Sequence, residues 1–158
     1  MSIESSRCYT KAVDYLSRRD HSRKELMTKL LRHEFEKEDI NNVLDLLQEK
    51  NYINEEEYLR VAVRSYGNRN YSPRKILEKL RTNGINVEQS EIQSIFEREG
   101  IDSNEAIDSN VRKIFRSLSH KEISDYEIDT KVTSRLFAKG FQIDEIRKSI
   151  ARVRELDS

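Results

Sequence analysis

One apolar pattern occurs three times in this chain, as SRKELMTKLLRHEF at Ser22–Phe35, SPRKILEKLRTNGI at Ser72–Ile85 and IDTKVTSRLFAKGF at Ile128–Phe141. In each segment an apolar residue is followed four places later by leucine, and five places after that by another apolar residue. The triplets are Leu26, Leu30 and Phe35; Ile76, Leu80 and Ile85; and Val132, Leu136 and Phe141. Because residues four apart share one face of an α-helix, each segment predicts a helix that ends in a turn.

The expected turn carries a glycine in two of the three segments. Gly84 and Gly140 directly precede the last apolar residue, and Glu34 takes this place in the first segment. Glycine suits this position because the residue after a helix commonly adopts the left-handed conformation. The first helix therefore has a weaker stop signal than the other two.

Helix starts are marked by short polar residues. Ser22, Asn54 and Ser124 each precede a glutamate by three places, which is the spacing of a capping box. Ser72 is followed by Pro73, and proline is favoured at the first helical position. These caps agree with helices that begin just after each of these residues.

A further amphipathic run lies before and after each of these segments. The runs before them contain Tyr9, Ala12, Val13 and Leu16; Tyr58, Leu59, Ala62 and Tyr66; and Val111, Ile114, Phe115 and Leu118. The runs after them contain Ile40, Val43, Leu44 and Leu47; Ile92, Ile95 and Phe96; and Ile146, Ile150 and Val153. With no strand alternation of useful length, we expect an all-α protein of three tandem three-helix repeats, at residues 1–53, 54–101 and 102–158, in an elongated, curved molecule.

Composition limits the classes of function. The chain has 158 residues, with 29 Lys and Arg against 29 Asp and Glu, so its formal net charge is zero. No overall field attracts it to nucleic acid or to a membrane, and any such attraction has to be local. The single cysteine, Cys8, excludes an internal disulfide and a metal site built from cysteines, and it is expected to be a free structural thiol.

No targeting segment is evident. The polar stretch at residues 1–11 lacks the apolar core of a secretory signal, and no run approaches the roughly 20 apolar residues that span a bilayer. A cytoplasmic protein that does not enter the membrane is expected.

No catalytic or cofactor motif is present. The glycines at 67, 84, 100 and 140 are too far apart for a phosphate-binding loop or a dinucleotide fingerprint. The histidines, His21, His33 and His120, lack the spacing of a zinc site, and His21 is expected to be solvated or to support a helix cap. We therefore expect a protein that is not an enzyme and that carries no metal or cofactor.

Positive charge gathers at corresponding places in the first two repeats, together with tyrosine. The residues are Arg18, Arg19, Arg23 and Lys24 in the first repeat, and Arg60, Arg64, Tyr66, Arg69, Tyr71, Arg74 and Lys75 in the second. Arginine and tyrosine side chains suit acidic protein surfaces, phosphates and exposed bases. We predict a contact surface for a partner or for DNA, with charges that merely solvate helix faces as the alternative.

Two stretches of the chain resemble the RecX family. They are Tyr15–Leu31 (YLSRRDHSRKELMTKLL), and Asn51–Arg64 (NYINEEEYLRVAVR) followed by Ser72–Ile85. Together with the third repeat, the resemblance covers nearly the whole chain. It implies a modular helical protein without a catalytic centre that binds the RecA recombinase filament on single-stranded DNA and modulates its ATPase and strand exchange, in most members by inhibition.

The resemblance also sets the expected partners. They are the RecA filament and single-stranded or double-stranded DNA, and the protein is expected to act as a monomer. Two other classes stay open: a stand-alone helical DNA-binding protein, which the zero net charge disfavours, and a helical adaptor for another protein.

Overall fold

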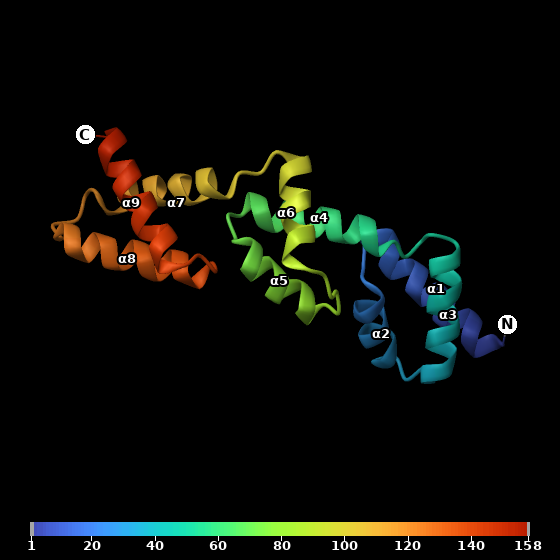
Figure 1. Cartoon of the computed structure of the whole chain (residues 1–158). Helices are drawn as coiled ribbons and strands as arrows, with labels where there is room; N and C mark the ends of the chain where they lie inside the picture. Colours follow the sequence, from blue (N-terminus) through green and yellow to red (C-terminus); the bar gives the residue numbers. More distant parts are fainter. Residues whose placement is uncertain (1, 158) are drawn as a thin grey trace. The chain divides into compact units, whose positions relative to one another are not determined.

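The computed structural model describes residues 2–157, and within that range it contains nine α-helices and no strand (Figure 1). The predicted all-α fold is therefore confirmed. The helices are α1 (Ile3–Arg18), α2 (Arg23–Leu31), α3 (Lys37–Glu49), α4 (Glu55–Asn68), α5 (Pro73–Thr82), α6 (Gln89–Glu99), α7 (Ser103–Leu118), α8 (Asp125–Ala138) and α9 (Ile143–Asp157).

The chain divides into two compact units. The N-terminal unit comprises the residues up to Ala62 together with Leu80–Asn86, and the C-terminal unit comprises Val63–Lys79 together with the residues from Val87 onward. Helices α4 and α5 therefore contribute residues to both units. The boundaries of the three repeats stay a prediction.

Helices α1, α2 and α3 pack pairwise into a bundle in the N-terminal unit. Leu26 and Leu30 of the first triplet are fully buried, and Phe35 packs against the same core. Cys8 is a free thiol, as expected, and it is fully buried; burial together with the charge of Asp39 raises the pKa of the thiol to about 11. The thiol is therefore protonated near neutral pH, and its role is packing.

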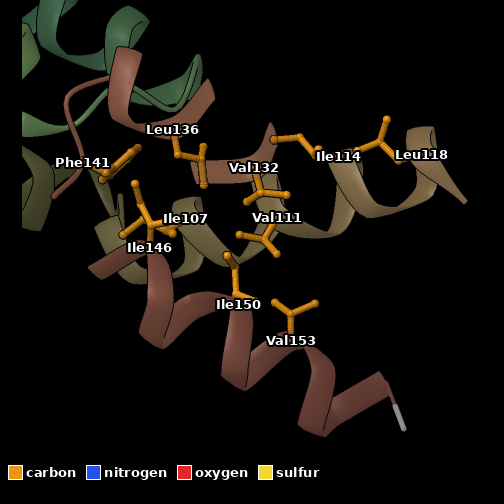
Figure 2. Close-up of a cluster of buried hydrophobic side chains, with 10 residues drawn as sticks. All are labelled: Ile107, Val111, Ile114, Leu118, Val132, Leu136, Phe141, Ile146, Ile150 and Val153. Atoms are coloured by element: carbon orange, nitrogen blue, oxygen red, sulfur yellow. The ribbon is translucent and has the colours of Figure 1, made fainter. Parts of the chain in front are cut away.

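Helices α7, α8 and α9 form the corresponding bundle in the C-terminal unit. Figure 2 shows its core, in which Val132 and Leu136 of α8 meet residues from α7 and α9. Val132, Leu136 and Phe141 of the third triplet are at most 2% exposed. Burial of this kind contributes roughly 1.5–3 kcal/mol per large apolar side chain, so the periodic residues supply most of the stabilisation of each bundle.

On α5 and α6 and in the turn between them, residues are buried at the places that the periodicity predicts. On α4, however, the buried apolar residue is Val63, and the predicted Tyr58, Leu59, Ala62 and Tyr66 are only partly buried. The buried set is Val63, Ile76, Leu80, Ile85, Ile92, Ile95 and Phe96. Gly67 of α4 is also buried, and a Cβ atom there would lie 2.9 Å from Ile101 Cδ1 and 3.2 Å from Phe96 Cε1. The end of α4 therefore packs closely against Phe96 of α6 and Ile101, and a side chain at this position would require both to shift.

The three turns after the triplet helices share one backbone conformation. Gly84 and Gly140 have φ angles of 79° and 93°, and Glu34 adopts 64° at the corresponding place. In the second and third turns the amides of Ile85 and Phe141 donate to the carbonyls of Leu80 and Leu136, which is the hydrogen bond of a Schellman motif. The predicted turns are thus confirmed, including the one that has no glycine.

The polar helix starts also form as the sequence predicts. Ser22 and Glu25 make a complete capping box, and the hydroxyls of Ser72 and Ser124 accept hydrogen bonds from the amides of Lys75 and Glu127. None of the helices in the described part of the chain is long and apolar enough to cross a membrane.

Candidate functional site

A pair of tyrosines is built by the turn between α4 and α5. Asn70 follows α4 with a φ angle of 65°, and the Tyr71 amide donates to the Tyr66 carbonyl over 3.1 Å. This turn is a Schellman motif, in which the residues at the two ends of that hydrogen bond come into side-chain contact. The rings of Tyr66 and Tyr71 consequently meet edge to face, with centroids 5.9 Å apart and planes inclined by 84°.

Three cations surround this ring pair. Arg69 Cζ lies 4.8 Å from the Tyr66 centroid, Lys79 Nζ lies 4.8 Å from the Tyr71 centroid, and Lys139 Nζ lies 5.8 Å from the Tyr71 centroid. Each distance falls within the range of a cation–π interaction, which contributes about 0.5–1 kcal/mol at an exposed site. We call Tyr66, Arg69, Tyr71, Lys79 and Lys139 the aromatic–cation cluster; all five belong to the C-terminal unit.

No acidic side chain neutralises the aromatic–cation cluster. Within residues 2–157, neither Arg69, Lys79 nor Lys139 forms an ion pair with a carboxylate. Both tyrosines are half-buried, so part of each ring is accessible beside the cations. This arrangement can bind an anion such as a carboxylate or a phosphate, and it can stack against a planar group.

Backbone contacts hold Lys139 in the cluster. The Ser72 amide donates to the Lys139 carbonyl over 3.1 Å, and Lys139 Nζ donates to the Arg69 carbonyl over 3.3 Å. The next residue, Gly140, packs so closely that a Cβ atom there would lie 2.3 Å from Ser72 Oγ and 2.5 Å from Lys75 Cβ. The turn after α8 is thus joined directly to the start of α5.

The predicted arginines of the first repeat are largely neutralised within the N-terminal unit. Arg18 pairs with Asp14 over 3.1 Å, and Arg23 pairs with Asp45 over 2.8 Å. Lys24 is exposed without a carboxylate partner in the described chain, and its aliphatic carbons lie against Gly84. Of these three residues, only Lys24 keeps its charge fully available for a ligand.

Arg19 belongs to a structural network at the start of α2. It pairs with Glu25 over 2.8 Å, and the hydroxyl of Tyr58 also bonds to Glu25 and accepts from Asn83. Burial raises the pKa of the Glu25 carboxyl, but hydrogen bonds from Arg19, Tyr58 and the Ser22 amide outweigh it, so the pKa lies below its usual value. Arg19 therefore stabilises the helix start.

The remaining predicted cations differ in their environment. Arg60 pairs with Glu57 over 2.7 Å, and Lys75 pairs with Glu78 over 3.2 Å. Arg64 and Arg74 are exposed, and their side chains form no hydrogen bond or ion pair with any residue in the described range. Of the predicted residues, the structure therefore brings Tyr66, Arg69 and Tyr71 together in one cluster.

His21 is buried rather than solvated, which corrects one of the two expectations for it. Its Nδ1 donates to the Arg19 carbonyl over 2.9 Å, and its Nε2 accepts from Lys29 Nζ over 2.8 Å. Lysine can only donate, so this geometry requires a neutral imidazole. Burial lowers the pKa of His21, with the positive charges of Arg19 and Lys29 adding to the effect, and the residue supports the connection that ends at the Ser22 cap.

The sequence did not point to Lys79 or Lys139. Lys79 lies one helical turn after Lys75 on α5, so helical periodicity could have placed it on the same face. Lys139 lies next to Gly140, which marks a turn, but no local pattern indicates that this turn packs on the start of α5. Only the tertiary contact brings it to the tyrosines.

The chain is similar to proteins of one family over nearly its whole length. Residues 8–47 match the family model described as RecX, first three-helix domain. The chain is 31% identical over 146 residues to the regulatory protein RecX of Pseudomonas tolaasii, covering 92% of this chain and 90% of the relative. It is 27% identical over 144 residues to the regulatory protein RecX of Vibrio vulnificus, covering 91% of each.

A solved structure has the same fold. The crystal structure of RecX from Lactobacillus salivarius superposes with a TM-score of 0.76 at 24% sequence identity, covering 98% of this chain and 99% of the other. The all-helical fold of this chain is therefore that of a solved structure.

Proposed function

This chain belongs to the RecX family of regulatory proteins, and on that premise we propose that it binds the RecA recombinase filament on single-stranded DNA and inhibits its ATPase and strand exchange. The proposal includes a monomeric, cytoplasmic protein with no catalytic activity of its own, built from repeats at 1–53, 54–101 and 102–158. The observation that carries it is the aromatic–cation cluster, whose three cations have no acidic partner within the described chain.

Unneutralised cations next to accessible rings favour an anionic partner surface. A protein filament on single-stranded DNA offers phosphates, exposed bases and the acidic side chains of its subunits, all of which such a cluster can contact. Zero net charge means that this attraction is local and does not extend to every polyanion. The protein would then select its partner by whether anionic groups on the partner can reach the aromatic–cation cluster.

Cations outside the cluster can supply additional contacts. Lys24 in the N-terminal unit, and Arg64 and Arg74 in the C-terminal unit, are exposed without acidic partners in the described range. Several weak contacts on adjacent subunits of one polymer add through effective concentration. They hold the filament in one state only if the protein binds that state better than the others.

Charge reversal in the cluster tests the proposal. A variant with Arg69→Glu, Lys79→Glu and Lys139→Glu should inhibit RecA ATPase on single-stranded DNA at least about tenfold less effectively, because three favourable contacts of at least about 0.5 kcal/mol each are lost. The measurements are ATP hydrolysis and filament length against protein concentration, with thermal unfolding to verify the fold. Lys79→Gln alone serves as a milder variant.

The matched control reverses three cations elsewhere on the C-terminal unit. Lys113, Lys121 and Lys131 are exposed and form no ion pair in the described chain, so their change to glutamate alters the net charge equally. This control should inhibit nearly as the natural sequence does. Equal loss in both triple variants would show a general charge effect and would overturn the role of the cluster.

Stand-alone binding to single-stranded DNA is a second candidate, and the same cluster favours it. Rings flanked by cations are typical of surfaces on which bases stack. Three phosphate contacts would give a slope of about −2 for log affinity against log salt concentration on a single strand. Tight binding to naked DNA with this slope, and no further gain when RecA is added, would favour the second candidate.

A further inference from the structure

A groove with large exposed apolar side chains lies between α8 and α9. It encloses about 850 Å³ and is lined by residues of both helices, among them Tyr126, Phe137 and Ile143. These three side chains are 80%, 59% and 45% exposed. These three side chains lie outside the buried core of the bundle, so water contacts their apolar surface.

The fold does not require apolar residues at the positions of Tyr126 and Ile143. When the triplet leucines Leu30 and Leu136 are aligned, Tyr126 corresponds to Asp20 and Ile143 corresponds to Lys37. Asp20 and Lys37 are both exposed on the first bundle, which has the same three-helix arrangement. A charged residue is thus compatible with the fold at these two places, whereas Phe137 corresponds to Leu31, which is also apolar and 45% exposed. The apolar residues at the positions of Tyr126 and Ile143 therefore distinguish the C-terminal bundle from the first.

The groove also contains one cation without a partner. Arg154 and Asp129 line it and neutralise each other, with Arg154 Nη1 donating to Asp129 Oδ2 over 2.8 Å. Arg147 lies on the same lining, and its guanidinium forms no hydrogen bond or ion pair with any residue in the described range. An occupant that supplies a carboxylate would pair with Arg147 in partly apolar surroundings, where such a pair is stronger than in water.

The dimensions suit a short helix. Tyr126 and Phe137 lie eleven places apart on α8, which corresponds to about 16 Å along the axis, or three helical turns. An amphipathic helix in a hydrophobic groove uses apolar side chains at the i, i+4, i+7 and i+11 places, over the same length. A symmetric dimer, in which the grooves of two copies face each other, fits less well. Each copy would have to supply a carboxylate for Arg147 of the other, and the only carboxylate on the lining, Asp129, is already bound to Arg154.

We propose that the α8–α9 groove binds an acidic amphipathic helix of a partner protein, with its apolar side chains between Tyr126 and Phe137 and a carboxylate on Arg147. This is a second contact surface, and it does not depend on RecA being the partner. It differs from the aromatic–cation cluster in chemistry, since it combines apolar area with a single charge.

A charge-swap experiment tests the proposal with two labelled synthetic helical peptides. Both carry leucines at the i, i+4, i+7 and i+11 places; one carries glutamates between them, and the other carries lysines at the same places. The natural protein should bind the glutamate peptide at least about fivefold more tightly in fluorescence anisotropy, as expected for one charged contact of about 1 kcal/mol. Arg147→Glu should reverse this preference.

Two controls separate the groove from the rest of the surface. Arg135→Glu makes the same charge change on an exposed residue of α8 outside the groove and should leave the preference unaltered. Phe137→Ser should weaken binding of the glutamate peptide about tenfold, whereas Tyr52→Ser, at an exposed tyrosine of the N-terminal unit, should not.

Three results would overturn the proposal. One is equal affinity of the natural protein for both peptides, and another is an equal effect of Arg147→Glu and Arg135→Glu. The third is a dimer in sedimentation that Phe137→Ser dissociates, because a second copy would then occupy the groove. Phe137 is exposed, so its replacement should not unfold the bundle, and circular dichroism verifies this.

Discussion

At the residue scale, Glu34 stands in a backbone conformation that suits glycine. Its φ angle of 64° lies in the left-handed region, where the corresponding residues of the other two repeats are Gly84 and Gly140. A side chain in this conformation costs roughly 1–2 kcal/mol, because its Cβ crowds the following carbonyl oxygen. The first turn forms nevertheless, since the buried Leu26 and Leu30 hold α2 in place.

Glu34→Gly should therefore stabilise the protein. The relief of strain exceeds the entropy that glycine loses on folding, so we expect the free energy of unfolding to rise by roughly 0.5–1 kcal/mol. Urea denaturation followed by circular dichroism measures this. Glu34→Ala removes the same carboxylate but keeps a Cβ atom, and a similar gain from it would assign the effect to charge instead.

At the scale of elements, the turns after α6 and α8 differ in what surrounds them. Gly100 and Gly140 both have positive φ angles, but a Cβ atom at Gly100 would meet nothing within 4 Å. At Gly140 a Cβ atom would collide with Ser72 and Lys75. One glycine serves the local turn alone, whereas the other also permits the approach of two helices.

Alanine substitutions should separate these two roles. Gly100→Ala should lower the free energy of unfolding by about 1–2 kcal/mol through backbone strain. Gly140→Ala should lower it by about 2–5 kcal/mol, because overpacking of about 1–3 kcal/mol is added. Thermal or urea unfolding compares the two variants. Equal decreases in the free energy of unfolding would show that α5 can move away from the added Cβ atom without loss of stability.

At the scale of the whole molecule, two buried clusters stabilise different bundles. Leu30 lies in the core of α1, α2 and α3, and Leu136 occupies the corresponding place in the core of α7, α8 and α9. No residue belongs to both clusters. Regions with separate cores can open separately, which hydrogen exchange detects.

Leu30→Ala and Leu136→Ala should each destabilise their own bundle by about 2–5 kcal/mol, since both leucines are at most 1% exposed. In hydrogen exchange, Leu136→Ala should reduce protection in α7–α9 more than in α1–α3, and Leu30→Ala should do the reverse. If each variant reduced protection equally in both bundles, the two cores would be one cooperative unit.

The sequence by itself determined the helices, their ends and the buried face of most of them, with α4, where Val63 is buried, as an exception. Leu26, Ile76 and Val132, with the leucines four places later, are buried as the period predicts, and the serine caps and glycine turns form where they were expected. These features depend on interactions between residues a few places apart, which the order of residues specifies. The family was also evident from the sequence, and the comparisons confirm it.

The tertiary structure alone decided which charges are available. Arg19 and Arg23 were predicted contact residues, yet carboxylates from outside their own helical turn neutralise them, while Lys139 reaches Tyr71 from a distant turn. Tyr126 and Phe137 become the two ends of a groove only because α9 packs beside α8. A periodic pattern reports burial along one helix, but the partner of a charged side chain depends on which helix packs beside it.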